Sequence, residues 1–540
     1  MTPVLSRTER IHPGCFWAGT LAVTVGVLLH MPMYIRSAAM NFSLAGMPVD
    51  NEMLAGMVLI IGGTVLAYYG LLPRPVASKS PGALAKRIAQ LTRETPASSK
   101  GNLNFAHWQL LAVLTLAVVI DSMKPATLGF VIPGMAVEYG LPRQIVALFP
   151  FCALTGLTIG SYAWGIVADR VGRRAAILLA GILFIGTAIC GSMPTFQWNL
   201  LMCFLMGLAA GGMIPITYAL LVECMPTKQR GWAVVLVGAV GLIGGWFAAS
   251  GAATLLEPYF GWRILWLLGA PTGLLLIACN KFIPESPRYL LARGRTKEAR
   301  ELVRRFAVEI DPRYWTNGTH AATAHSGLLL IGPQFRTTTA TLNLTAGAWG
   351  LVNFGLLLWL PADLRTRGYS VSGTNELLLY SSLLALPTTL LLAWFYSRWS
   401  TKWTLVALTV LTALALISLS LLNSRLPVLQ HNPFILFAVL MVGVNGTIAV
   451  LLPYSAESYP VLVRGRGTGL VAGTSKLGGL AVNALTAAAL VPDLITAGLA
   501  LAVPVALSAG MIARYGGETR DCNLETAAVI SADRAVEQSA

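Results

Sequence analysis

Ionisable side chains occur inside two apolar segments of this sequence. Asp121 and Lys124 lie in one of them, directly before Pro125. Their spacing of three residues places both on one face of a helix. Pro125 has no N–H to donate to the carbonyl of Asp121, so we expect a bend there with that carbonyl left free. Such a pair can handle a proton and bind an anion, or it can be a structural ion pair that is neutral overall.

Lys476 lies in the second apolar segment, just before Gly478 and Gly479. Its depth of about ten residues corresponds to about 15 Å of helix, which is far for a lysine to reach an aqueous interface. A charged group at the centre of a bilayer costs roughly 2.5–3.5 kcal/mol on insertion scales, and such groups therefore mark functional candidates. Lys476 either binds an anionic ligand or has a structural partner.

Aromatic and polar side chains in neighbouring apolar segments could line the same cavity. The candidates are Trp349, Asn353, Asn445 and Tyr454. An aromatic ring or a carboxamide suits a small organic ligand. The alternative for each of these residues, taken singly, is packing between helices, and it is the more common one.

These residues need long apolar helices to position them. Roughly 20 consecutive apolar residues cross the hydrocarbon core of a bilayer as a helix. The sequence contains fourteen such blocks, two leading ones at about 16–35 and 53–72 and then two sets of six, at about 108–132, 145–166, 175–193, 199–221, 232–254, 263–282, 342–362, 377–396, 403–422, 434–454, 466–490 and 492–513. We expect the first block to be a retained helix, with a signal peptide as the alternative.

Composition and charge exclude several classes of protein. Of 540 residues, 55% are hydrophobic and 11% charged, which is too few charges for a soluble chain of this length. The net charge of +15 would suggest nucleic acid, but the basic residues gather in alternate loops, which predicts that those loops are cytoplasmic. We therefore expect an inner-membrane protein with both termini in the cytoplasm and no nucleic-acid partner. The seven cysteines show no metal-ligand spacing, and no nucleotide loop or nucleophile motif occurs, so we expect no metal, no cofactor and no enzymatic activity.

An internal repeat divides the apolar blocks into two related halves. Six residues recur at one offset of 234 residues: Glu223, Pro226, Arg230, Gly231, Gly244 and Gly245 return as Glu457, Pro460, Arg464, Gly465, Gly478 and Gly479. A parallel repeat of six helices each is the arrangement that this predicts. The Glu and Arg positions at helix ends can latch loops by ion pairing, and the glycines allow helices to approach closely.

The domain organisation follows from the blocks and the repeat. We expect an all-α polytopic membrane protein with two extra leading helices and a cytoplasmic linker, a first six-helix half, a cytoplasmic loop with amphipathic helices, a second six-helix half and a cytoplasmic tail, at 1–104, 105–283, 284–341, 342–515 and 516–540.

A loop between the fourth and fifth blocks carries a specific motif. Its residues Gly165, Asp169, Arg170, Gly172, Arg173 and Arg174 match GxxxDRxGRR at every fixed position. The motif resembles the signature loop of the major facilitator superfamily, and the resemblance with the repeat covers about 105–515. It implies gating roles for Asp169, Arg170, Arg173 and Arg174, together with Glu223, Arg230, Glu457 and Arg464. The corresponding stretch of the second half has Ser397 in place of the acid, so a second cytoplasmic latch is not expected there.

Two further stretches resemble particular branches of this superfamily. Pro284–Leu290 and Glu518–Glu525 are similar to the PESPRWL and ETKGxxLEE elements of sugar porters and organic-ion transporters. The ninth block lacks the paired glutamines of sugar porters and instead ends in Leu-Trp-Leu-Pro361, which resembles the aromatic-acid and nicotinate transporters. The third block departs from that group, because it lacks the paired aspartates.

The residues and the resemblance together predict a monomeric secondary active transporter that imports a small organic anion, a monocarboxylate, by proton symport and alternating access. Lys124 and Lys476 would attract the carboxylate, and Asp121 would take the coupling proton because its pKa responds to the paired lysine. Its partners would be the small-molecule substrate, protons and the lipid bilayer. The alternatives are a symporter of a sugar or other neutral metabolite, a drug efflux antiporter and a non-transporting nutrient sensor.

Overall fold

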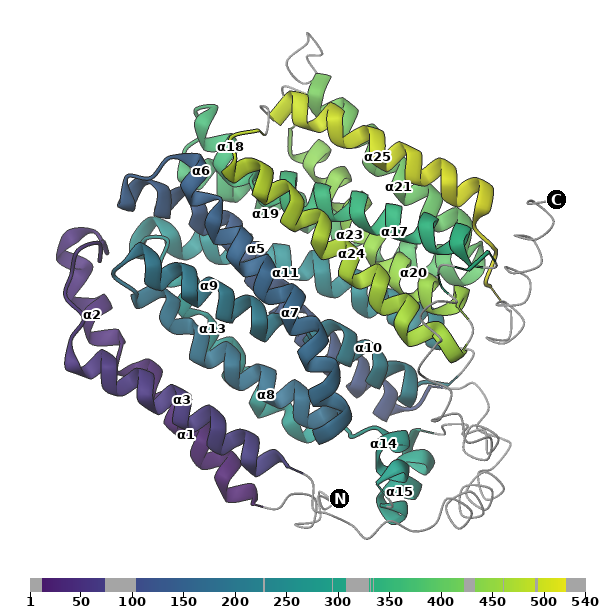
Figure 1. The fold of residues 1–540 in the computed structure, drawn as a ribbon, viewed down its shortest axis with the longest axis horizontal. Coiled ribbons are helices and arrows are strands. Elements are labelled where there is room, and N and C mark those ends of the chain that lie inside the picture. The colour runs from purple at the N-terminus through teal and green to yellow at the C-terminus, as the bar shows by residue number, and fades with distance from the viewer. Residues whose placement is uncertain are drawn as a thin grey trace. The chain divides into compact units, whose positions relative to one another are not determined.

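The structure is a computed structural model, which describes residues 12–72, 103–226, 229–293, 295–306, 330, 332–333, 335–421, 433–459, 461–490 and 494–520. Within these ranges the chain forms helices and connecting turns and contains no strand, as the apolar blocks predict. The helices, which are labelled in Figure 1, divide into two compact units. The first contains 1–121, 159–230 and 263–319, and the second contains 122–158, 231–262 and 320–540.

The first unit begins with a helical hairpin and continues with helices of the first repeat. Its elements are α1 (Pro13–Leu28), α2 (Met31–Arg36), α3 (Asn51–Leu71), α8 (Arg173–Gly186), α9 (Phe196–Ala210), α10 (Met213–Cys224), α12 (Ile264–Leu267), α13 (Gly269–Ala278), α14 (Pro287–Ala292) and α15 (Thr296–Phe306), with 3₁₀ turns at Ser37–Met40, Thr187–Ser192 and Cys279–Phe282. Two longer helices, α5 (Phe105–Tyr139) and α7 (Leu148–Val171), belong partly to this unit and partly to the second.

The second unit contains the second repeat and the remaining parts of α5 and α7. Its other elements are α6 (Arg143–Val146), α11 (Arg230–Phe260), α17 (Arg336–Leu351), α18 (Leu360–Thr366), α19 (Val371–Ala385), α20 (Thr388–Arg398), α21 (Thr401–Leu421), α23 (Pro433–Ser458), α24 (Val461–Ala487) and α25 (Leu494–Tyr515), and a π-helical segment covers Val352–Leu357. Only the first residue of α11 belongs to the first unit.

Thirteen helical stretches in the described residues are long and apolar enough to cross a membrane. Each coincides with one of the predicted blocks, and the remaining block corresponds to α24. This helix is 27 residues long but carries Lys476 and Asn483 among many glycines, which lowers its hydropathy. The predicted block that is missing from these thirteen stretches is therefore the helix that holds Lys476, one of the candidate binding residues.

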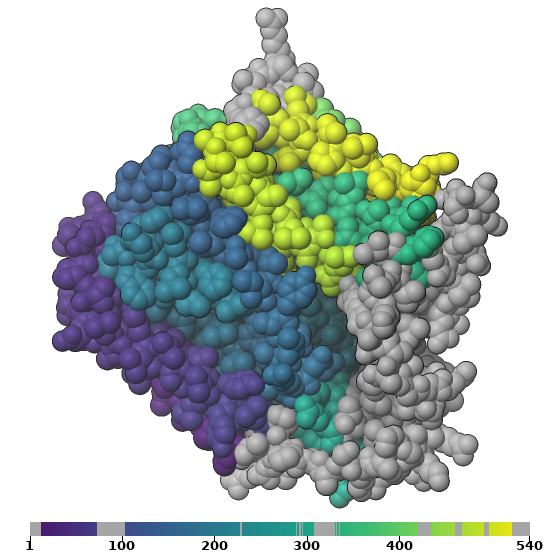
Figure 2. Space-filling model, viewed as in Figure 1, coloured from purple at the N-terminus to yellow at the C-terminus, as the bar shows by residue number. Residues whose placement is uncertain are grey.

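The leading hairpin packs through glycines. A Cβ atom on Gly19 would lie 2.5 Å from the carbonyl oxygen of Gly63, and one on Gly26 would lie 2.6 Å from that of Gly56, so α1 and α3 touch along their backbones. The pair lies along α8 in the first unit (Figure 1), where Gly186 faces Ile60. In Figure 2 the purple surface of this hairpin runs beside the blue and teal surface of the first unit. Small residues at helix contacts provide the packing that apolar burial cannot supply in lipid.

The two ends of the second unit can be told apart by α11. Gly231 at its start lies beside Tyr396 and Glu457, and Glu257 near its other end lies about 40 Å away at 1.5 Å per residue. We call the end with Glu457 and Glu518 the tail end, and the end with Glu257 the outer end. The loops rich in Lys and Arg predict that the tail end faces the cytoplasm.

Candidate functional site

The predicted proton and anion residues of α5 are both buried. Asp121 is 3% exposed and Lys124 is 6% exposed, and the helix continues through Pro125. Directly after Asp121, a Cβ on Gly245 of α11 would lie 2.5 Å from Cβ of Ser122. Gly245 therefore lets α11 approach the backbone of α5 at Ser122 and Met123, within one turn of Lys124. The close helix approach expected at Gly245 is confirmed.

The equivalent glycines of the second repeat have the same role. A Cβ on Gly479 of α24 would lie 2.6 Å from the ring of Phe354, and Gly478 faces the carbonyl oxygen of Gly347 in α17. Gly350 in turn faces the carbonyl of Ser475. The turn of α24 that contains Lys476 is thus in backbone contact with α17, and Lys476 itself is half-buried.

Three of the other predicted cavity residues lie in this part of the second unit. Trp349 Nε1 donates to the carbonyl oxygen of Val444 at 2.8 Å, and the neighbouring Asn445 donates to that of Met441 at 3.0 Å. Asn353 lies in the π-helical segment, and its buried Oδ1 has no hydrogen-bond partner among the described residues. Single-turn π segments are frequent at functional sites, and a buried acceptor without a donor is a candidate contact for a ligand.

Tyr454 lies apart from these three residues, at the tail end. Its hydroxyl donates to the carbonyl oxygen of Gly517 at 2.7 Å. It lines a small pocket together with Thr341, Ser458 and Glu518. The structure therefore connects Tyr454 to the tail, while its predicted role in substrate binding stays a prediction.

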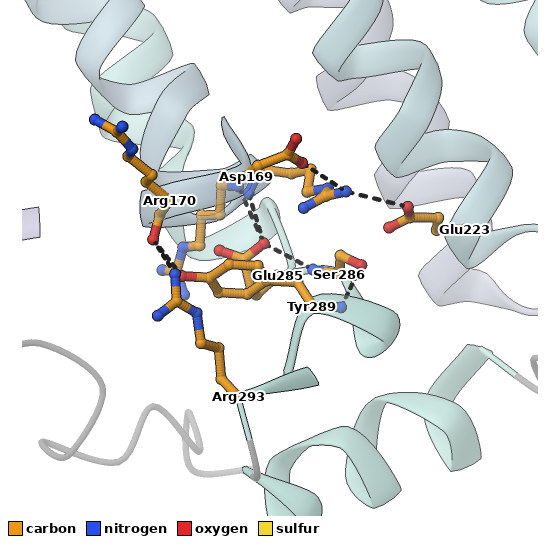
Figure 3. Close-up of polar contacts among 9 residues, drawn as sticks. Asp169, Arg170, Glu223, Glu285, Ser286, Tyr289 and Arg293 are labelled. Carbon is orange, nitrogen blue, oxygen red and sulfur yellow. Dashed lines mark hydrogen bonds and ion pairs between the residues drawn. The ribbon is translucent and has the colours of Figure 1, made fainter. Parts of the chain in front are cut away.

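The signature loop of the first unit is organised by a carboxylate that sequence reasoning did not select. Glu285 Oε1 accepts the backbone N–H of Arg173 at 2.8 Å and that of Ser286 at 2.9 Å (Figure 3). It thereby satisfies free N–H groups in the first turn of α8. Gly172 has φ of 101°, and a side chain there would collide with this carboxylate. The glycine of the motif is required for both reasons.

The predicted gating residues of this loop take different positions. Nη2 of Arg173 lies 3.4 Å from Asp169 and 3.7 Å from Glu223. Arg174 is buried and donates to Oδ1 of Asn280 at 2.7 Å. Arg170 points away from the cluster in Figure 3 and contributes its carbonyl oxygen, which accepts from Tyr289 and Arg293. Arg173 thus lies between the carboxylates of Asp169 and Glu223, while the gating roles of these residues stay a prediction.

The tail end of the second unit repeats this arrangement. Glu518 Oε1 accepts the backbone N–H of Thr401 at 3.0 Å, at the start of α21. Glu457, the repeat partner of Glu223, accepts from Tyr396 at 2.8 Å and from Thr519 at 2.6 Å. A second contact of this kind therefore exists at the tail end although Ser397 replaces the acid of the motif, because the tail supplies the carboxylate. Among the remaining gating candidates, Arg230 begins α11, and the side chain of Arg464 lies outside the described part of the chain.

The two helix-capping carboxylates differ in acidity. Burial raises the pKa of Glu285 above its ordinary value, although three backbone N–H groups act in the opposite direction. Burial would also raise the pKa of Glu518, but the hydrogen bonds from Ser400, Thr401 and Arg520 outweigh it and lower that pKa. A carboxylate that accepts several hydrogen bonds is stabilised in its ionised form.

The signal for these carboxylates was present in the sequence. Glu285 and Glu518 belong to the two stretches that resemble the PESPRWL and ETKGxxLEE elements, and each follows the last helix of its half. Each carboxylate binds the first turn of another helix, and the distance along the sequence did not predict that contact. Among the described residues no group of three or more His, Cys, Asp or Glu could hold a metal ion.

Comparisons with known proteins agree on one family. Residues 114–483 match the model of the Major Facilitator Superfamily. The niacin transporter NiaP of Acinetobacter baylyi is 27% identical over 392 residues, which cover 69% of this chain and 85% of that protein. The 4-hydroxybenzoate transporter PcaK of the same organism is 28% identical over 387 residues, covering 69% and 82%. Its benzoate transport protein is 26% identical over 399 residues, covering 70% and 83%.

Solved structures show the same fold. The proton:xylose symporter XylE, bound to 6-bromo-6-deoxy-D-glucose, superposes with a TM-score of 0.63 at 17% identity and covers 78% of this chain and 98% of XylE. The partially occluded inward-open form of XylE from E. coli gives a TM-score of 0.62 at 15% identity, covering 78% and 100%. This likeness concerns the fold alone.

Proposed function

Because the chain belongs to the major facilitator superfamily, we propose that it is a secondary active transporter that imports a small organic monocarboxylate together with a proton. The observation that carries the proposal is the burial of Asp121 and Lys124, at 3% and 6% exposure, on one face of α5. An isolated charge in such a place is costly, and the residues are retained where they bind or move charge.

The charge balance favours an anionic substrate. Lys124 and Lys476 exceed Asp121 by one positive charge when Asp121 is ionised and by two when it is protonated. A carboxylate offsets one of these charges, and the low effective dielectric strengthens that attraction relative to water. Protonation of Asp121 would then raise the affinity for the anion, which couples the two ligands. A neutral sugar would offset neither charge.

The names of three relatives and the aromatic residues support an aromatic acid as the class of substrate. Relatives named for niacin, benzoate and 4-hydroxybenzoate transport all carry an aromatic monocarboxylate. In this chain the ring centroids of Trp349 and Phe354 lie 5.6 Å apart, edge to face. The adjacent residue Asn353 has a buried Oδ1 without a hydrogen-bond partner among the described residues. Rings and an amide of this kind suit an aromatic acid. We place the protein in the inner membrane with both termini cytoplasmic, on the distribution of basic residues. We also propose that it acts as a monomer.

Ligand-induced stabilisation tests the binding part of this proposal. A ligand that binds only the folded state raises stability by about 2.7 kcal/mol at 100 times its dissociation constant. We expect niacin, benzoate or 4-hydroxybenzoate to raise the unfolding temperature of the purified protein, and the corresponding amides and D-xylose to leave it unchanged. Stabilisation by the sugar without the acids, or by acid and amide equally, would contradict an anion site.

A further inference from the structure

The outer end of the second unit contains two ion pairs. In one the acid comes from the first repeat, and in the other the base does. Arg365 Nη2 lies 2.9 Å from Oε1 of Glu257 and 3.2 Å from Oε2. Asn375 Nδ2 donates to the same carboxylate at 2.8 Å. The side chains of Arg365 and Glu257 are 15% and 6% exposed, so this is a buried pair with a third polar partner.

The second pair joins α6 to α18, the short helix that also carries Arg365. Arg143 Nη1 lies 2.7 Å from Oδ1 of Asp363, with exposures of 43% and 9%. The guanidinium group of Arg143 also lies over the ring of Trp359, 4.8 Å from its centroid. A cation between a carboxylate and an aromatic face is held by two favourable contacts.

Helix α18 is the element that both pairs share. It presents the acid Asp363 to a base of the first repeat and the base Arg365 to an acid of the first repeat. Each charge on α18 thus has an opposite charge in the other half of the sequence repeat. The π-helical segment Val352–Leu357 precedes α18 almost directly, which gives the chain an irregular turn before it.

The buried pair is not saturated with hydrogen bonds. Nε of Arg365 and Oδ1 of Asn375 are buried and have no hydrogen-bond partner among the described residues. A buried charge pair offsets its desolvation cost fully only when all its polar atoms are satisfied. These contacts therefore hold the two repeats together without making their separation prohibitive, as a reversible contact requires.

We infer that Glu257–Arg365–Asn375 and Arg143–Asp363 form an ionic clamp that holds the outer ends of the two repeats together and opens when the transporter faces outward. The four charged residues are positioning residues for transport and bind no substrate. The inference rests on alternating access in this family and is independent of the substrate. Below the clamp, the hydroxyls of Ser250 in α11 and Ser382 in α19 are buried and 3.4 Å apart. Opening of the clamp would expose them to the outside.

Labelling of Ser382→Cys measures this exposure without any substrate. The full-length protein is expressed with its natural cysteines replaced by serine, and intact cells are treated with a membrane-impermeant maleimide. Labelling after denaturation gives the total amount of protein. We expect slow labelling in the parent and at least tenfold faster labelling with Glu257→Gln or Arg365→Gln. The matched control is Arg367→Gln, an exposed arginine two residues further along, which should label like the parent.

Exchange of the two charges separates a clamp from a general loss of stability. Glu257→Arg with Arg365→Glu restores the pair in reverse, and Asn375 can turn its unpaired Oδ1 toward the arginine. We expect the double variant to label at least threefold more slowly than either glutamine variant. Parent-like labelling of both glutamine variants, or no slowing in the double variant, would overturn the inference. If the glutamine variants do not reach the membrane, Asn375→Ala, which keeps both charges, takes their place, and parent-like labelling of it overturns the inference.

Discussion

The carboxylate of Glu285 accepts the backbone N–H of Arg173 at 2.8 Å, and this contact attaches the segment after the eighth membrane span to the first turn of α8. The same carboxylate lies against Gly172, whose positive φ admits it. The signature loop is therefore stabilised by a residue more than a hundred positions further along the chain. Glu518 makes the equivalent contact to the first turn of α21 in the second unit.

Removal of the Glu285 carboxylate should destabilise the protein. Glu285→Ala leaves the N–H groups of the first turn of α8 without their acceptor, and an unsatisfied buried donor costs about 1–3 kcal/mol. Thermal unfolding in detergent checks this. Glu301→Ala, an exposed glutamate on α15, serves as the control and should change stability by less than about 0.5 kcal/mol. Equal effects of both substitutions would show that the contact with Arg173 contributes nothing.

The contact of Glu518 should depend on pH with a definite sign. Its pKa is lowered from the ordinary value of 4.5, so its stabilisation is present above pH 4.5 and is lost as the pH falls through the lowered value. Glu518→Gln should therefore unfold at a lower temperature than the wild type at pH 7, and the difference should shrink in acid. A difference that stays constant down to the lowest pH would rule out this linkage. For Glu285, whose pKa is raised, the slope has the opposite sign.

The protonatable residue of α5 should control accumulation. Asp121→Asn cannot take up a proton, so uptake driven by a pH gradient should be lost while exchange of substrate across the membrane continues. Proteoliposomes loaded with unlabelled niacin measure the exchange, and empty ones with an imposed gradient measure accumulation. If accumulation survives the substitution, the coupling proton binds elsewhere and the pair with Lys124 is structural.

Lys476 should distinguish a carboxylate from its amide. Lys476→Gln removes the charge but keeps a polar side chain of similar length, so affinity for niacin should fall at least tenfold, about 1.4 kcal/mol. Affinity for nicotinamide should change little. Lys402→Gln, at the tail end of the second unit, provides a control. Equal loss for acid and amide would assign Lys476 a structural role and restore the neutral-substrate alternative.

Much of the fold could be predicted because its causes are local. Long apolar runs predict membrane helices, and the repeated Gly245 and Gly479 predicted close helix contacts that the structure confirms. The ion pair between Glu257 and Arg365 could not be predicted, because the residues lie 108 positions apart and no periodicity relates them. Tyr454 illustrates another limit. Its position in the sequence predicts where it lies along α23, but its hydrogen bond to Gly517 depends on the path of the tail after α25, which the sequence does not specify.

Transport of niacin and nicotinamide by the wild-type protein tests the central claim most directly. The two molecules differ in one group, a carboxylate or its amide. In proteoliposomes with an imposed inward proton gradient, and with protein-free liposomes as background, we predict accumulation of niacin that collapses when a protonophore removes the gradient. Nicotinamide should not accumulate. Gradient-driven accumulation of nicotinamide, or niacin uptake that ignores the gradient, would contradict proton-coupled import of a monocarboxylate.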